Sequence, residues 1–354
     1  MFMQIKQISA VGVLFGFLVS CAMPSTQKGA DVPANQNLSA AIANETKAKK
    51  LTVYSGRDEK IMAPLIAKAK AELGLDIEVR YGDSTELAIA LTEEGVNSPA
   101  DVFYSQDAGA LGAVAKNNLT TQIPNSLLQQ VDEQFRSPQG SWVGVSGRAR
   151  VIDYNTNLVK PSELPAGVSQ LADAKWRSKV GWAPNNGSFQ AFVGAMSVLE
   201  GEEKTLAWLK AMKANGTKSY SGNSAIVEAL GRGEIALGLV NNYYLYRFKT
   251  KDANFPVALH HTRGDAGALI NVAGLAVLKT TDQPSDAERF VAYMLKPDVQ
   301  TFITQQFYEY PLIKGIPVAQ SQLPLEQLQT PKLDLSKLDD LARTQKLIQE
   351  AGLL

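Results

Sequence analysis

The stretch that decides the fold is residues 51–105, LTVYSGRDEKIMAPLIAKAKAELGLDIEVRYGDSTELAIALTEEGVNSPADVFYS. Apolar segments at 51–54 and 101–105 and a segment of alternating polar and apolar residues at 76–80 predict three β-strands. After the first strand, apolar residues recur at every fourth position and predict an amphipathic helix that Gly74 ends. Asp83 or Ser84 is expected to begin a second helix, which ends near Gly95. This βαβαβ order predicts an α/β fold with a mostly parallel sheet covered by helices.

The same alternation continues along the rest of the chain. The predicted strands lie at 179–182, 235–240 and 272–278, and the predicted helices at 188–199, 202–212 and 289–295. A capping box, Ser285 to Glu288, is expected to open the last of these helices. No internal repeat and no long linker interrupts this pattern, so the connections between the units should be short.

Composition excludes several classes of function. The chain has 354 residues, of which 45% are hydrophobic, enough for more than one compact unit. Lys+Arg and Asp+Glu are both 35, which disfavours a protein that binds nucleic acid by bulk charge. A single cysteine excludes intrachain disulfides, Cys-rich zinc sites and iron–sulfur clusters. Only two histidines are present, at the adjacent positions 260 and 261, outside the candidate sites below.

The amino terminus has the pattern of an export signal. Lys6 precedes an apolar run over residues 8–19, which is short for a membrane span and ends at Ser20-Cys21. This end resembles a bacterial lipobox, so residues 1–20 are predicted to be a lipoprotein signal peptide and Cys21 the lipidated residue. The alternative is a chance cysteine beside an ordinary cleavage site. Residues 21–50, with little apolar periodicity, are expected to form a flexible tether.

A pair of tyrosines follows one predicted strand directly. Tyr243 and Tyr244 come after the amides Asn241 and Asn242, at the carboxyl end of the strand 235–240. Ligands of open parallel sheets bind outside this end of the strands. A phenol has a pKa near 10, but a highly charged hard cation displaces its proton. The alternative is structural: one ring packs in the core and the other caps it with a hydrogen bond.

Two other strand ends carry polar residues. The turn Trp182 to Ser188, WAPNNGS, opens a helix and offers free N–H groups to an anion, or is an ordinary capped turn. A similar helix start follows Gly222. The segment 98–107, SPADVFYSQD, ends in Asp107, which is expected either to ligate a cation or to cap the next helix. Arg148 and Arg150 either add positive potential near an anion or are solvated strand residues.

Taken together, these pieces resemble the ferric-ion-binding proteins of ABC importers, which have the type 2 periplasmic-binding-protein fold. The resemblance covers nearly all of 51–325. It is carried by the segments LTVYSG (51–56), SPADVFYS (98–105), VSGRARV (145–151), NNYY (241–244), DAGAL (265–269) and EYPL (309–312). The tyrosine pair and the SPADVF segment are the most specific of these.

The resemblance implies a two-lobed fold with a ligand cleft between the lobes. Lobe 1 is expected to comprise 51–150 and 274–325, and lobe 2 to comprise 151–273 and 326–354. The lobes are expected to be joined by extended crossovers near 146–152 and 270–276. The cargo is expected to be Fe3+, bound by Tyr243 and Tyr244 with a synergistic anion, phosphate or carbonate. The anion cradle is predicted at Asn186, Gly187, Ser188, Asn223 and Asn241.

The chain departs from the family pattern at two positions. Asp58 stands where the family often has a histidine ligand, and Gln106 followed by Asp107 stands where it often has a glutamate. Asp58 and Asp107 are therefore the candidates for the remaining iron ligands. Asp58 has an alternative role as the N-cap of a helix that starts at Glu59.

The whole protein is accordingly expected to be a monomeric, non-enzymatic solute-binding lipoprotein. It would lie on the periplasmic or other extracytoplasmic face, attached by its lipid, bind no nucleic acid and deliver iron to a membrane permease. No activated nucleophile beside a base and no metal-hydrolase spacing is present in the sequence. The alternative within the same fold is a binding protein for an oxyanion or small organic solute without metal.

Overall fold

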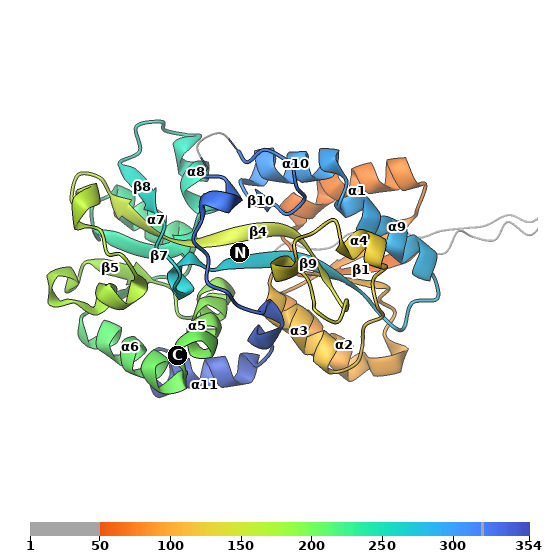
Figure 1. The fold of residues 1–354 in the computed structure, drawn as a ribbon, viewed down its shortest axis with the longest axis horizontal. Helices are drawn as coiled ribbons and strands as arrows, with labels where there is room; N and C mark the ends of the chain where they lie inside the picture. The colour runs from red at the N-terminus through yellow and green to blue at the C-terminus, as the bar shows by residue number, and fades with distance from the viewer. Residues whose placement is uncertain (1–49, 320–321) are drawn as a thin grey trace, which may run out of the picture. The chain divides into compact units, whose positions relative to one another are not determined.

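The computed structural model describes residues 50–319 and 322–354 (Figure 1). The predicted signal peptide, Cys21 and the tether up to residue 49 lie outside the described residues. In the described part no helix is long and apolar enough to span a bilayer.

In the described part of the chain, eight strands form one continuous path of pairing, β2-β1-β3-β9-β4-β7-β5-β6, and β8 and β10 pair with β4 off this path. One half of the fold, called the first half below, is built on the strands β1 (Leu51–Ser55), β2 (Ile77–Tyr81), β3 (Val102–Ser105), β9 (Ile270–Val277) and β10 (Tyr310–Pro311). The second half is built on β5 (Val180–Trp182), β6 (Lys218–Ser219), β7 (Leu237–Asn241) and β8 (Val257–His260). β1 pairs in parallel with β2 and β3, and β5 pairs in parallel with β6 and β7.

The long strand β4 (Val143–Asn155) belongs to both halves (Figure 1). Its residues up to Ala149 pair with β9, whereas those from Arg150 onward pair with β7 and β8, all antiparallel. One strand therefore passes from one sheet region to the other between two successive residues. All 13 residues of β4 are buried, as expected for a strand covered on both faces.

Helices cover the sheet of each half. Those of the first half are α1 (Glu59–Leu73), α2 (Ser84–Glu94), α3 (Ala108–Lys116), α4 (Asn125–Leu128), α9 (Pro284–Met294) and α10 (Pro297–Phe307). Those of the second half are α5 (Gly187–Glu200), α6 (Glu202–Ala214), α7 (Asn223–Gly231) and α8 (Tyr243–Lys249). The predicted α/β fold and its strand and helix order are confirmed. As predicted, α1 ends at Gly74, which takes the left-handed conformation at φ 65°.

The carboxy-terminal segment contacts both halves. A 3₁₀ turn at Leu335–Leu338 packs on α3, and α11 (Leu341–Glu350) packs on α5 and α6 (Figure 1). The first contact is close, since a Cβ atom on Gly109 of α3 would lie 2.7 Å from the carbonyl oxygen of Leu338.

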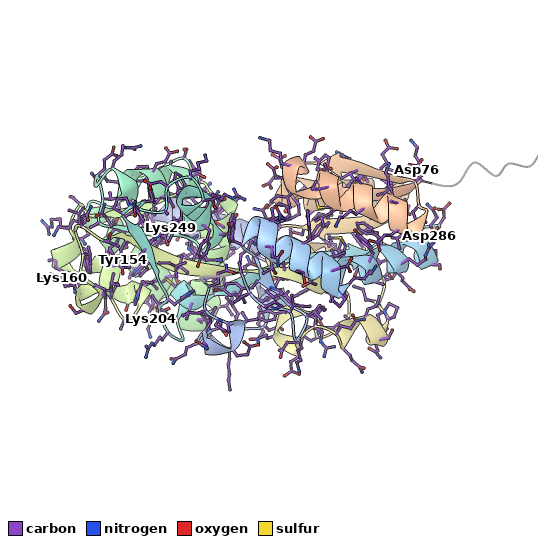
Figure 2. All side chains as sticks on the ribbon, turned by 90° about the horizontal axis from the view of Figure 1, so that it is seen from above. Asp76, Tyr154, Lys160, Lys204, Lys249 and Asp286 are labelled. Carbon is purple, nitrogen blue, oxygen red and sulfur yellow. The ribbon has the colours of Figure 1, made fainter. Side chains whose placement is uncertain are left out.

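The residues labelled in Figure 2 show where the two halves lie. In Figure 2 Lys249 of α8 and Tyr154 of β4 lie in the second half, and Asp76 and Asp286 lie together in the first. The second half has a core of its own, centred on the aromatic side chains Trp182, Phe189, Phe192 and Trp208. Trp182 and Phe189 meet edge to face at 5.5 Å between ring centroids, a favourable aromatic geometry.

Candidate functional site

A cavity of about 450 Å³ is lined by residues of both halves. The first half contributes the starts of α1, α2 and α3, which follow β1, β2 and β3 at the carboxyl ends of these parallel strands. The second half contributes the start of α5 and the end of β7. Arg148 and Arg150 of β4 line it as well, and so do Leu338, Leu341 and Thr344 of the carboxy-terminal segment. This is the position at which open α/β sheets bind ligands.

The carboxylates on the first-half wall are helix caps. Asp58 is exposed, caps α1 and accepts a hydrogen bond from the Lys60 N–H at 2.8 Å. Asp107 caps α3 and accepts from the Ala110 N–H at 3.0 Å. Burial raises the pKa of Asp107, and the Ala110 N–H and the charge of Arg148 oppose that rise. The capping alternative is thus observed for both residues, yet both also line the cavity.

A third acidic cap, Asp83 of α2, lines the same wall. Its side chain accepts hydrogen bonds from the N–H groups of Thr85 and Glu86. From the sequence, Asp83 was expected only to begin a helix. Its carboxylate was detectable because it follows a predicted strand in the same way as Asp58 and Asp107.

The five predicted anion-binding residues come together in the second half. Asn186 Oδ1 accepts hydrogen bonds from Ser188 N–H at 3.1 Å, Ser188 Oγ at 2.5 Å and Asn223 Nδ2 at 3.1 Å. Asn223 Oδ1 accepts in turn from the Asn241 N–H at 3.2 Å. Gly187 adjoins open space, because a Cβ atom there would meet nothing within 4 Å. The polar donors of this cradle therefore bond to one another around the start of α5.

Tyr243 and Tyr244 form the first turn of α8, directly after β7 and Asn242. Their rings stack at 4.3 Å between centroids with 28° between the planes. Tyr243 is only 5% exposed and Tyr244 is half-buried. Burial, and next the neighbouring Tyr244, raise the pKa of Tyr243, while the charge of Arg148 opposes them.

The tyrosines are not among the residues that line the cavity. They are linked to it electrostatically, through the three arginines that do line it. Tyr243 interacts with Arg57, Arg148 and Arg150, and Tyr244 interacts with Arg150. The tyrosine pair thus interacts electrostatically with the arginines of the wall, whereas Asp58 and Asp107 line the first-half side of the cavity.

A buried ion pair joins Arg57 of the cavity wall to Glu309, and the sequence alone did not indicate it. Arg57 Nη2 contacts Glu309 Oε1 at 2.5 Å, and Ser146 Oγ donates to Glu309 Oε2 at 2.5 Å. Arg57 and Glu309 are 2% and 1% exposed. Although burial alone raises it, the charges of Arg57 and Arg148 hold the pKa of Glu309 below its usual range. Arg57 follows the YSG run and Glu309 begins the EYPL segment, so both stood in segments that pointed to the family.

Arg148 and Arg150 have no such carboxylate partner among the described ion pairs. The Nε and Nη2 atoms of Arg148 and the Nε atom of Arg150 are buried without hydrogen bonds. Arg150 Nη2 donates to the Leu239 carbonyl at 2.9 Å, and Nη1 lies 3.4 Å from Ser188 Oγ and from Asn241 Oδ1. Burial lowers the pKa of Arg150 to about 9. Of the two sequence alternatives for these arginines, solvated strand residues are excluded.

Within the described residues no group of three or more His, Cys, Asp or Glu side chains is placed to hold a metal ion. The two histidines lie away from the cavity wall. His260 is in β8 with its Nε2 atom 2.8 Å from the Pro165 carbonyl oxygen. Burial, and next His260, lower the pKa of His261 to about 4.

Comparison with known proteins shows the family to which the chain belongs. The family model of the bacterial extracellular solute-binding proteins matches residues 97–336, and the chain belongs to this family. A major ferric iron-binding protein of Neisseria meningitidis is 32% identical over 322 residues, which cover 89% of this chain and 97% of the relative. Since the family is one of solute-binding proteins, the prediction that the chain is not an enzyme is confirmed.

Two solved structures of iron-binding proteins are similar to this chain. Iron-bound HitA from Pseudomonas aeruginosa matches with a TM-score of 0.80 and 32% identity, over 86% of this chain and 99% of that one. IdiA (FutA) from Trichodesmium, in complex with iron and citrate ligands, matches with a TM-score of 0.77 and 28% identity, over 86% and 100%. The resemblance to ferric-ion-binding proteins and the periplasmic-binding fold are both confirmed.

Proposed function

We propose that this protein binds Fe3+ outside the cytoplasm and delivers it to the permease of an ABC importer. The observation that carries the proposal is the stacked pair Tyr243 and Tyr244 at the carboxyl end of β7. Two adjacent phenol oxygens are hard donors suited to a small trivalent cation. The relatives named above are described as ferric iron-binding or were solved with iron, which supports the same cargo.

Burial raises the pKa of Tyr243 above its usual value, so this phenol is protonated in the iron-free protein. Fe3+ displaces the phenol proton, and the charges of Arg148 and Arg150 favour the negative phenolate. Binding therefore releases protons and weakens in acid. Reduction to Fe2+ weakens it too, because the less charged ion gains less from hard anionic oxygens.

Asp58 and Asp107 are proposed to complete the metal site from the first half. Both line the first-half side of the cavity, and Asn186, Gly187, Ser188 and Asn241 of the anion cradle line its second-half side. A cation that contacts both halves favours the form in which they are close, by its differential affinity for the two forms. β4 and β9, which pair with each other and with strands of the two halves, are the elements that such a movement bends.

A synergistic anion is proposed at Asn186, Gly187, Ser188, Asn223 and Asn241. These residues surround the start of α5, where the helix dipole favours negative charge. Phosphate and carbonate are the anions that the sequence resemblance implies. Lipidation at Cys21 and attachment to the membrane remain proposals for the amino-terminal segment. The tether would then hold the protein near its permease and raise its effective concentration there.

A second candidate function is supported by Arg148 and Arg150, whose unpaired N–H groups suit an oxyanion or small organic solute without metal. An absorption spectrum separates the two functions. Purified protein with ferric salt and phosphate or carbonate should develop a visible phenolate-to-iron band. Protein that stays colourless under these conditions, while binding the anion alone, would support the second function and refute the first.

A further inference from the structure

Arg247 lies against the rings of the tyrosine pair. Its guanidinium carbon Cζ is 4.9 Å from the ring centroid of Tyr243 and 5.3 Å from that of Tyr244. Because the two centroids are themselves 4.3 Å apart, a single guanidinium is close to both rings. Both distances are within the range, about 6 Å, in which the electrons of an aromatic ring attract a cation. The pair that carries the proposed iron site therefore has a permanent positive charge beside it.

The spacing of these three residues on α8 produces the contact. Arg247 follows Tyr244 by three positions and Tyr243 by four, and residues three and four apart are neighbours on one face of a helix. Side chains on a helix lean toward its N-terminus, so Arg247 reaches back to the rings of the first turn. The contact is formed within the single segment YYLYR, and it is therefore kept however far apart the two halves of the molecule are.

Among the described residues, no ion pair neutralises Arg247. Its side chain is exposed and has no carboxylate partner there. The arginines of the cavity wall are different, because they are buried and held by other groups. Arg57 pairs with Glu309 at 2.5 Å, and the guanidinium of Arg150 lies 5.3 Å from the ring of Phe192. The charge of Arg247 thus remains available to the tyrosine rings, and substitutions at this exposed position should leave the fold intact.

We propose that Arg247 is a positioning residue that acts through the tyrosine pair and lowers the preference of the site for Fe3+ over Fe2+. The inference rests on the proposed function for the iron, and it names a regulating residue of that same site. A phenol bound to the metal is negatively charged, so its ring attracts the guanidinium more strongly than a neutral phenol does. The positive charge in turn draws electron density toward itself, which makes both phenolate oxygens weaker donors to the metal.

Removal of this charge has two consequences of definite sign. The visible band of an iron phenolate moves an electron from the ring to the metal. Because the guanidinium contacts the rings, it stabilises the ring electrons more than the orbitals of the metal, and without it the band moves to longer wavelength. The charge also repels a trivalent ion more than a divalent one. Without it the ratio of Fe3+ affinity to Fe2+ affinity therefore rises.

The test compares two variants with side chains of similar length. Arg247→Met removes the charge but keeps a flexible side chain that packs on aromatic rings, whereas Arg247→Lys keeps the charge. Each is loaded with ferric salt and bicarbonate, and spectroelectrochemical titration gives the band and the affinity ratio from one sample. Arg247→Met should move the band to longer wavelength and raise the ratio of Fe3+ to Fe2+ affinity by about 5-fold or more. Arg247→Lys should leave both close to their wild-type values.

Lys249→Met is the matched control. It removes the other cation in the last turn of α8, where either residue also interacts favourably with the helix dipole. This variant should change neither the band nor the affinity ratio. Circular dichroism checks that all variants fold, and Arg247→Gln is the second neutral variant if Arg247→Met does not.

Two results would overturn the proposal. One is a neutral variant at position 247 with the band and affinity ratio of the wild type. The other is an Arg247→Lys variant that shifts as far as Arg247→Met, since the loss of packing rather than of charge would then explain both. The wild-type protein tests the iron proposal separately. Absence of its band refutes that proposal and this one with it, whereas a wild-type band that the neutral variants leave unchanged refutes only the role of Arg247.

Discussion

At the scale of single residues, the tyrosine pair carries the proposed iron site. The double variant Tyr243→Phe with Tyr244→Phe should lose the visible band and weaken Fe3+ binding by more than about 100-fold, since changing even an outer partner of a metal ligand costs 10–100-fold. The variant keeps both rings and their 4.3 Å stacking, so folding should be little affected. Spectrophotometric titration against a competing chelator measures the change. A double variant that retained colour and affinity would remove the tyrosines from the site.

Asp58 offers a matched pair of variants that separates capping from ligation. Asp58→Ala and Asp83→Ala each remove an acidic N-cap on the cavity wall, and each should lower the free energy of unfolding by about 1 kcal/mol. Only Asp58→Ala should also weaken Fe3+ binding, on the order of 10-fold. Chemical denaturation and iron titration read the two effects. Equal iron affinity in both variants would show that Asp58 is a helix cap and not an iron ligand.

The buried ion pair of Arg57 and Glu309 should contribute strongly to the free energy of unfolding. Glu309→Gln leaves Arg57 without its counter-charge and should lower the free energy of unfolding by about 3–5 kcal/mol at pH 7. Glu326→Gln, at an exposed position, is the control.

The pH dependence of this loss follows from the lowered pKa of Glu309. A carboxyl group with a lower pKa in the folded state stabilises the protein above its unfolded pKa of about 4.3 and loses that contribution as pH falls. The difference between wild type and Glu309→Gln should therefore shrink below about pH 4. A difference that stayed constant down to pH 3 would show that the pair contributes no charge-dependent stability.

At the scale of elements, the first βαβαβ unit was predictable because its signals are local. β1 and β3 are apolar, β2 alternates polar and apolar residues, both helices have an aspartate cap, and Gly74 takes the left-handed conformation that its position requires. The predicted capping box at Ser285 to Glu288 was wrong. α9 begins at Pro284, with Gln283 as N-cap and no side-chain cap bond. Proline is favoured in the first turn of a helix, and here it starts the helix before Ser285 can cap it.

β4 was the element least visible in the sequence. Its segment VGVSGRARVIDYN contains Gly147, Arg148, Arg150 and Asp153, which are untypical of a strand buried on both faces. The glycine is explained by crowding, since a Cβ atom on Gly147 would lie 3.0 Å from Ile270 of β9. The arginines are explained by the cavity that they line. Neither cause can be seen without the tertiary structure.

Alanine substitutions at two glycines, on helices that border the cavity, should have different effects on stability. Gly109→Ala places a Cβ atom 2.7 Å from the Leu338 carbonyl oxygen, so it should destabilise the protein by about 1–3 kcal/mol. Gly187→Ala meets nothing within 4 Å and should leave stability unchanged, while its methyl group obstructs an anion at the start of α5. Thermal denaturation and anion titration read the two effects. Equal stability in the two variants would show that the carboxy-terminal segment does not press on α3.

At the scale of the whole molecule, the candidate site depends on elements far apart in sequence. The YSG, SPADVF and NNYY segments were recognised individually, and the fold order was predictable from them. The hydrogen bonds among Asn186, Ser188 and Asn223 could not be predicted from the sequence, because they join α5 to α7. The Arg57–Glu309 pair could not be predicted either, because its members are 252 positions apart. Such contacts are set by topology rather than by local propensity.

The last prediction concerns movement of the two halves. The proposed ligands divide between them: Asp58 and Asp107 lie on the first-half wall, and the tyrosines and α5 belong to the second half. Iron together with an anion should therefore favour a closed form by its differential affinity. Small-angle X-ray scattering should show a smaller radius of gyration for the loaded protein than for the iron-free protein. The Tyr243→Phe, Tyr244→Phe variant should show no decrease under the same conditions. Stoichiometric iron binding with an unchanged radius of gyration would confine the metal to the second half and exclude Asp58 and Asp107 as ligands.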